Sequence, residues 1–232
     1  MRKLKKILVQ LITDIASSLS QNKIIKTSEI SVKVNLGCGL HCLPGWINID
    51  GSLTSLLGSS KFDLINKIIY KLAGSSAYYK FQDYNNIIKT TNLKFYNLKN
   101  KVPFKDSSVD ALYCSHFLEH LSKSDGKEFL SNCFRVLKSD GVFRIVVPDL
   151  DVAFAMYQRG EVEKMQDLFF YTSTEWDFSA HKYNYNFEYL SSVLKSVGFD
   201  LIERKIYREG DCPDINYLDL YPDHSLYVEC RR

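Results

Sequence analysis

The 232-residue chain predicts an α/β fold with a mostly parallel sheet. Strand-like and helix-like segments alternate along it with short links, which is typical of that class. A glycine turn directly follows an apolar strand at 32–36, as at ligand-binding strand ends. Hydrophobic residues make up 45% and charged residues 25%, as in globular domains. A chain of this length buries about 70% of its surface, so it needs neither disulfides nor metals to fold.

The first element is a predicted amphipathic helix over Met1–Ser20 within an N-terminal segment 1–30. Its apolar residues recur at steps of three and four: Leu4, Ile7, Leu8, Leu11, Ile12, Ile15 and Leu19. We expect this stripe to pack on the domain. Two alternatives stay open: a basic helix on an anionic membrane, and an export signal whose apolar stretch is broken by Gln10 and Asp14.

Alternating patterns predict the remaining elements, which form one domain over 31–232. The predicted strands are Val32–Leu36, Trp46–Asp50, Leu93–Leu98, Ser108–Tyr113, Val142–Val147, Asp200–Tyr207 and Ser225–Cys230. The predicted helices are 62–72, His116–Lys138, 150–180 and Tyr185–Val197. Gly141 is predicted to end the second of these as a left-handed cap, and Gly198 is predicted to end the fourth. Residues 51–92 are interpreted as an insertion covering the cleft.

Charge and cysteine usage limit the partners and the compartment. Residues 1–33 carry seven Lys/Arg against two acids, whereas the whole chain has a net charge of only +3. The main body is therefore near neutral, which argues against a nucleic-acid partner. Six scattered cysteines without a CxxC pair indicate free thiols in a reducing, cytoplasmic compartment. No apolar run is long enough to span a membrane.

The glycine turn predicts a ligand site. Gly37 and Gly39 allow the backbone to turn tightly, and Asp50 ends the next strand beside them. A carboxylate placed there can accept both hydroxyls of a ribose. Cys42 stands where the dinucleotide-binding fingerprint has its third glycine. That fingerprint also places its acidic residue about 20 residues after the glycines, whereas Asp50 follows Gly39 much sooner, so the pattern argues against an NAD-binding site.

Four segments in order carry a family resemblance: VNLGCGLHCLPGWINID, NLKNKVPFKDSSVDALYCSHFLEHL with FRVLKSDGVFRIVVPDLD, HKYNYNFEYLSSVLKSVGF, and SLYVE. The chain resembles class I S-adenosylmethionine-dependent methyltransferases. It is most similar to small enzymes that accompany glycosyltransferases in bacterial surface-polysaccharide pathways. The resemblance implies a Rossmann-like three-layer sandwich, with a mostly parallel seven-stranded sheet and an antiparallel C-terminal strand. The first helix is reduced, because only Leu40–Gly45 separate the turn from the second strand.

The resemblance also implies S-adenosyl-L-methionine as cofactor. The residues that it assigns to the cofactor are Asn35, Gly37, Cys38, Gly39, Asp50, Asn97, Leu98, Cys114, Ser115 and His116. The glycine turn meets the aminopropyl-carboxylate end and Asp50 the ribose. Asn97 stands beside the adenine where the family usually has Asp; its amide oxygen still accepts a hydrogen bond.

Methyl transfer from a sulfonium is an in-line displacement, so the protein mainly aligns the acceptor and excludes water. An alcohol acceptor also needs a base. The candidates are His181, Asp149 and His116, with His181 or Asp149 favoured. Asp149 can instead cap the following helix, and His181 can be a satisfied structural histidine.

The run from His116 to His120 reads HxxEH, an inverzincin-like zinc pattern with Glu119 between the histidines. It follows a predicted strand, and the third ligand is unspecified, so we expect a scaffold role and no metal. A zinc hydrolase and a non-catalytic interaction subunit remain alternatives.

The favoured function is methyl transfer to an oxygen or nitrogen of a small-molecule or glycan-like acceptor. Aromatic side chains that could stack on sugar rings are Tyr78, Tyr79, Tyr171, Trp176, Tyr183 and Tyr185.

Overall fold

The structure is a computed structural model that describes the chain except residues 1, 28, 100 and 171–179. The chain divides into two compact units, Met1–Phe104 (unit 1) and Lys105–Arg232 (unit 2).

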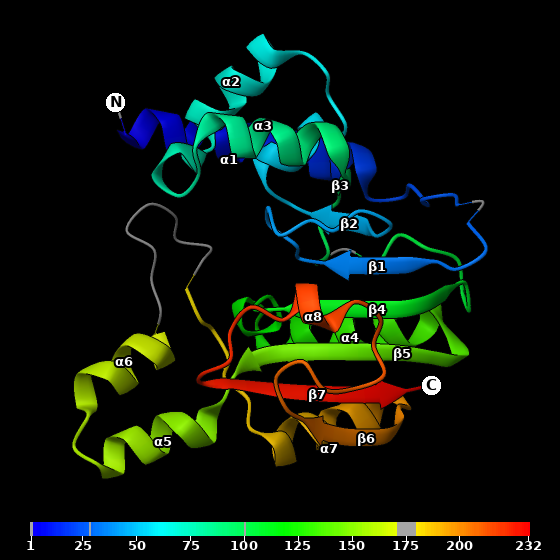
Figure 1. The fold of residues 1–232 in the computed structure, drawn as a ribbon, viewed down its shortest axis with the longest axis vertical. Coiled ribbons are helices and arrows are strands. Elements are labelled where there is room, and N and C mark those ends of the chain that lie inside the picture. The colour runs from blue at the N-terminus through cyan, green and yellow to red at the C-terminus, as the bar shows by residue number, and fades with distance from the viewer. Residues whose placement is uncertain (1, 28, 100, 171–179) are drawn as a thin grey trace. The chain divides into compact units, whose positions relative to one another are not determined.

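Unit 1 contains three parallel strands: β1 (Lys33–Leu36), β2 (Ile47–Asp50) and β3 (Asn92–Phe95). β2 lies between the other two (Figure 1), with Leu36 opposite Ile49 and Asp50 opposite Phe95. The link from β1 to β2 contains turns and no helix, so the prediction of a reduced first helix is confirmed.

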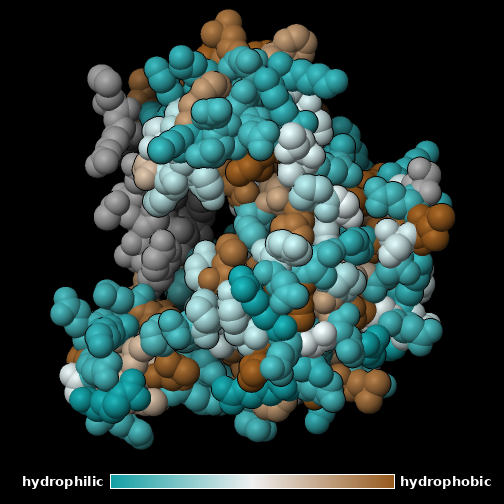
Figure 2. All heavy atoms as spheres, in the orientation of Figure 1, coloured by the Kyte–Doolittle hydropathy of each residue, from teal (hydrophilic) through white to brown (hydrophobic). Residues whose placement is uncertain are grey.

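The segment between β2 and β3 is helical. It contains η1 (Leu53–Leu57), α2 (Asp63–Leu72), η2 (Ser75–Ala77) and α3 (Phe81–Thr90). α3 buries Tyr84 and Ile88 against Cys38 and Leu93. α2 matches the predicted helix, but it leaves large apolar side chains exposed (Figure 2, over α2): Leu64, Ile65 and Ile68, with Phe62 just before it.

The first helix, α1 (Arg2–Ser20), packs on unit 1 through an unexpected face. Val9, Ser17 and Ser20 are buried, and the Asn97 side-chain amide donates to Ser17 Oγ over 3.0 Å. The predicted stripe faces outward instead. Leu4, Ile7, Leu8, Leu11, Ile15 and Leu19 are each at least 45% exposed. The expectation that this stripe packs on the domain is therefore wrong. Small side chains make the contact, because they let the helix backbone approach closely.

Unit 2 contains four strands in the order β4-β5-β7-β6. They are β4 (Val109–Ser115), β5 (Leu137–Pro148), β6 (Asp200–Lys205) and β7 (Ser225–Arg231). β4 and β5 are parallel, and β7 is antiparallel to both β5 and β6. Over the described residues, the mostly parallel strands and the antiparallel C-terminal strand confirm the predicted fold class.

The helices of unit 2 correct two expectations around the HxxEH run. They are η3 (Leu118–His120), α4 (Lys123–Val136), α5 (Leu150–Gln158), α6 (Val162–Phe170), α7 (Phe187–Val197) and α8 (Ile215–Leu218). The predicted helix from His116 is wrong, because α4 begins only after Ser122, whose hydroxyl accepts from Asp125 N. His116 and His120 therefore do not share one face of an α-helix.

The two glycines predicted to close helices behave differently. Gly141 lies inside β5, where a Cβ would meet Leu137 Cγ at 2.7 Å, so its assignment as a left-handed cap is wrong. β5 begins at Leu137, which already pairs with Val109 of β4, and this pairing overrides the turn-like sequence. Gly198 closes α7 at φ 112°, as predicted. The predicted helix at 150–180 is divided into α5 and α6, and its end lies outside the described residues.

A buried ion cluster holds the connection from β6 to β7 in unit 2. Arg144 of β5 donates to both carboxylate oxygens of Asp219 and to Glu229 Oε1, over 2.6–3.0 Å. It also donates to the carbonyls of Ile206 and Glu209. The guanidinium is fully buried, and these two carboxylates balance its charge.

Candidate active site

The glycine turn of unit 1 leaves β1 in the left-handed conformation. Gly37 has φ 69° and Gly39 has φ 53°, values that glycine adopts without strain. The N–H groups of Gly37 and Cys38 both donate to Ile49 O, and Gly39 N donates to Asp50 Oδ2 over 2.9 Å. The turn is therefore fastened to the end of β2, as the strand-end argument predicted.

Asp50 retains acceptor capacity beyond these contacts. Its Oδ1 accepts from Ser52 N over 2.7 Å and its Oδ2 from Gly39 N. Each carboxylate oxygen has a further lone pair, and the side chain is half-buried. A Cβ built on Gly39 would have no atom within 4 Å, so space is open in front of the turn. This carboxylate and open turn fit a ribose diol and its attached chain.

Two predicted cofactor residues lie behind the turn. Asn35 is buried, and its amide donates to His41 O over 2.9 Å, so it stabilises the segment that follows the glycine turn. Cys38 is buried against α3, and burial raises the pKa of its thiol. Sequence reasoning missed Asn48, whose buried amide donates to Leu43 O and Trp46 O and shapes the short β1–β2 link. An asparagine in the middle of an apolar strand is the feature of the sequence that could have indicated a structural role for Asn48.

Asn97 and Leu98 follow β3 in the same unit. The Asn97 amide group donates to Ser17 of α1, and its oxygen accepts from Lys99 N over 3.2 Å. Leu98 is buried. The polar position expected beside the adenine thus also anchors α1.

His116 follows β4 in unit 2 with φ 49°, a left-handed value that is uncommon for a residue other than glycine. Its Nδ1 lies 3.2 Å from Glu119 Oε1 and its Nε2 3.2 Å from Ser225 Oγ. The side chain is 26% exposed and packs edge-on against Tyr221. Cys114 before it is buried, which raises the pKa of its thiol, and Ser115 is half-buried.

Asp149 takes the capping role that the sequence left open. Its Oδ1 accepts from Asp151 N at the start of α5, and its Oδ2 accepts from Arg204 over 2.7 Å. Burial raises the pKa of this carboxyl group. Both oxygens are thus engaged in contacts that join α5 to β6.

His181 is largely buried, at 7% side-chain exposure. Its Nδ1 lies 3.0 Å from Leu168 O, and because a carbonyl only accepts, Nδ1 carries the proton. Burial lowers the pKa of this ring and favours its neutral form.

The three predicted bases gather at the carboxyl ends of β4 and β5. His116 follows β4 and Asp149 follows β5. The segment that carries His181 runs beside both: Lys182 N donates to Glu119 O, and Leu150 N donates to Tyr185 O. The sequence analysis placed Glu119 between His116 and His120, but it gave no signal that His181 lies beside the same carboxylate.

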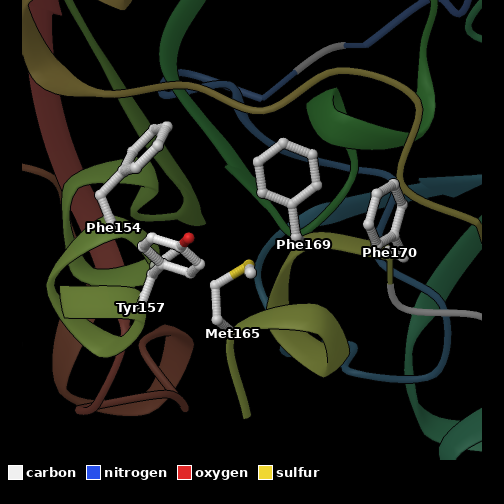
Figure 3. A pocket seen from close by; sticks show the side chains of 6 residues that line it. Phe154, Tyr157, Met165, Phe169 and Phe170 are labelled. Atoms are coloured by element: carbon white, nitrogen blue, oxygen red, sulfur yellow. The ribbon is translucent and has the colours of Figure 1, made fainter. Parts of the chain in front are cut away.

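An aromatic pocket of about 290 Å³ lies between α5 and α6 in unit 2 (Figure 3). Phe154 and Tyr157 enter from α5, and Met165, Phe169 and Phe170 from α6. Of the aromatic residues predicted to stack on sugars, Tyr78 and Tyr79 are exposed, Tyr185 is buried, and Tyr171 and Trp176 lie outside the described residues. The pocket offers ring faces from side chains that the sequence analysis did not select.

Comparisons with known proteins point to one domain class. The family model described as a methyltransferase domain matches residues 81–145, from α3 into β5. The match includes Asn97 and His116 but not the glycine turn or Asp50. A comparison with functionally curated proteins finds no significant match.

Several solved structures resemble the chain weakly. An S-adenosylmethionine-dependent methyltransferase from Archaeoglobus fulgidus is 16% identical, with a TM-score of 0.46 over 100% of this chain and 95% of that one. A possible histamine N-methyltransferase from Thermotoga maritima is 12% identical, with a TM-score of 0.46 over 99% and 96%. Magnesium protoporphyrin IX methyltransferase from Synechocystis, with bound S-adenosylhomocysteine, is 10% identical, with a TM-score of 0.46 over 100% and 83%.

The match over residues 81–145 supports a methyltransferase domain.

Proposed function

We propose that the protein transfers a methyl group from S-adenosylmethionine to an oxygen or nitrogen of a small-molecule or glycan-like acceptor. The observation that carries the proposal is Asp50, whose carboxylate fastens the glycine turn and still has lone pairs for a ribose. The methyltransferase-domain match over the adjoining residues supports it. Neither the zinc-hydrolase nor the interaction-subunit alternative has comparable support.

In unit 1, Asp50 would accept from the ribose hydroxyls and Asn97 would face the adenine. Gly37 and Gly39 leave room for the backbone to approach the aminopropyl chain. When bound, the cofactor supplies an activated methyl group on a sulfonium sulfur. The protein therefore has to orient the acceptor and exclude water.

In unit 2, we assign proton removal to His116 among the three candidates. Its ring is partly exposed, its Nε2 lies 3.2 Å from Ser225 Oγ, and its Nδ1 lies 3.2 Å from the buried Glu119 carboxylate. Asp149 is committed to its cap and to Arg204, and the ring of His181 is largely buried. A histidine beside a buried carboxylate is a common arrangement for a general base.

The acceptor class rests on the resemblance to polysaccharide-pathway enzymes and on the pocket between α5 and α6. The pocket presents aromatic ring faces. Aromatic faces of this kind stack against flat or apolar surfaces, including the C–H face of a sugar ring.

Calorimetric titration with S-adenosylhomocysteine tests the cofactor. We expect a dissociation constant in the micromolar range, about −8 kcal/mol. A screen of acceptors, beginning with sugars, then follows release of S-adenosylhomocysteine. If millimolar ligand does not bind to the folded wild-type chain, the proposal is wrong. Binding without turnover on any acceptor would favour the interaction subunit.

We also propose that α1 attaches the protein to the anionic cytoplasmic face of a membrane. Six large apolar residues of α1 face outward in a segment whose charge is strongly positive. An amphipathic helix with basic flanks binds such an interface by burying its apolar stripe. The free, mostly buried cysteines agree with a reducing compartment. No helix among the described residues is long and apolar enough to cross a membrane.

We expect the double variant Leu8→Gln, Leu11→Gln to bind vesicles of phosphatidylglycerol and phosphatidylcholine at least tenfold more weakly than the wild type. Burying one Leu side chain contributes about 1.5–3 kcal/mol, so losing two buried Leu side chains should weaken vesicle binding by more than tenfold. Co-sedimentation at several lipid concentrations measures the effect. Ile206→Gln, which removes an equally exposed apolar residue from unit 2, is the control. Equal binding by all three proteins would refute the attachment.

A further inference from the structure

Glu119 is a fully buried carboxylate in unit 2, and neither of its oxygens has a hydrogen-bond partner among the described residues. His116 Nδ1 lies within ion-pair distance of Oε1, but not in a direction that makes a hydrogen bond. The backbone N–H groups of Lys182 and Tyr183 donate to the main-chain carbonyl of Glu119 and not to its side chain. A buried carboxylate without donors is costly unless a cation or a proton compensates it.

Two histidines lie beside this carboxylate. One ligand atom from each of Glu119, His120 and His181 falls within 4.8 Å of the others. The ring centroids of His120 and His181 are 5.2 Å apart, and His181 Nε2 lies 4.0 Å from Glu119 Oε1. Two nitrogens and one carboxylate oxygen thus converge on one small volume.

The tautomers of both histidines are fixed by backbone carbonyls. His120 Nδ1 lies 3.2 Å from Ala180 O, and His181 Nδ1 lies 3.0 Å from Leu168 O. Since a carbonyl cannot donate, each Nδ1 carries a proton, and each neutral ring keeps its lone pair on Nε2. An Nδ1–H donated to a carbonyl is the usual outer contact of a metal-binding histidine.

We propose that Glu119, His120 and His181 bind a divalent transition metal, with Zn²⁺ as the first choice. Two imidazoles and a carboxylate are a common zinc ligand set, with ligand distances of about 2.0–2.2 Å. Ligand atoms around one such ion lie roughly 3.3–4 Å apart, so the three side chains would close by about an ångström. The fourth position is left for water.

A protonated histidine is the competing explanation for the buried carboxylate. The two explanations differ in a measurable property, because a protonated histidine has no lone pair on Nε2 with which to bind Zn²⁺. A bound cation compensates the same carboxylate while both rings stay neutral.

The metal would join the end of β4 to residues that are distant in the sequence. His120 belongs to η3, whereas His181 lies 61 positions further on and is bonded to α6 through Leu168 O. This site differs from the HxxEH zinc pattern, because His181 takes the place of His116 in the ligand set. Its role is structural, and it does not depend on the proposed methyl transfer.

The test uses the full chain purified without a histidine tag. After dialysis against EDTA and addition of Zn²⁺, we expect about one equivalent of bound zinc by mass spectrometry and a Tm raised by several degrees. His120→Gln, His181→Gln and Glu119→Gln should each lower zinc affinity at least tenfold. His224→Asn, at an exposed histidine of the same unit, should leave it unchanged.

Some outcomes would overturn the site. One is a wild-type chain that binds less than about 0.1 equivalent and shows no shift in Tm. Another is zinc that persists in the three variants but disappears in Cys42→Ser, which would place the metal on the Cys38–Cys42 thiol pair, whose sulfurs lie 3.8 Å apart. If the variants do not fold, the visible absorption spectrum of the wild type with added Co²⁺ distinguishes the two cases. Visible Co²⁺ absorption bands without a thiolate charge-transfer band support the site, and a spectrum without visible bands rejects it.

Discussion

Arg144→Leu is expected to destabilise the protein by about 3–5 kcal/mol at neutral pH. The substitution removes a fully buried guanidinium and leaves Asp219 and Glu229 without their common cation. It also removes one donor from each of the carbonyls of Ile206 and Glu209. Urea unfolding followed by circular dichroism measures the change.

Arg159→Leu is the matched control, because Arg159 pairs with Glu161 at the surface and should contribute less than about 1 kcal/mol. Adding Asp219→Asn to Arg144→Leu should restore part of the loss, since it removes one uncompensated buried charge. If Arg144→Leu costs no more than Arg159→Leu, the buried cluster does not support the connection from β6 to β7.

Asp50→Asn should weaken binding of S-adenosylhomocysteine about a hundredfold in calorimetric titration. Two charge-assisted hydrogen bonds to a ribose contribute about 1.5–3 kcal/mol each, and a neutral amide cannot replace both. Part of the lost affinity comes from the glycine turn, which is held less firmly in the variant because Asp50 accepts from Gly39 N and Ser52 N.

A ligand without ribose hydroxyls separates the two causes. The wild type should bind this analogue more weakly than S-adenosylhomocysteine but more tightly than Asp50→Asn binds S-adenosylhomocysteine, because the wild type keeps the contacts that fasten the turn. The variant should scarcely distinguish the two ligands. Asp63→Asn, an exposed acid of the same unit that pairs with Lys89, should bind like the wild type. Unchanged affinity in Asp50→Asn would remove Asp50 from the cofactor site.

Local sequence was sufficient to predict the glycine turn and its acid. Gly37 and Gly39 adopt left-handed angles that few other residues tolerate, and Asp50 ends a short apolar strand next to them. Both features depend on neighbours within about a dozen residues, where backbone preference and strand pairing are decisive. The prediction that the first helix is reduced succeeded for the same reason, because six residues leave no room for it.

Local sequence failed where a distant partner decided the outcome. The sequence around Gly141 favours a turn, yet pairing with β4 extends β5 through it. Periodicity located the apolar stripe of α1, but it carries no information about which face of the helix the domain covers. Helix propensity and turn chemistry are weak preferences, and tertiary contacts override them.

What the sequence determined by itself is the α/β class, the glycine turn with Asp50, and the strand ends that carry His116 and Asp149. Tertiary structure alone decided that Glu119, His120 and His181 meet, and that Arg144 is buried between Asp219 and Glu229. The physical reason is chain separation. A turn is fixed by the dihedral angles of adjacent residues, whereas these clusters join side chains up to 85 positions apart, and only the packed fold determines which of them share a buried volume.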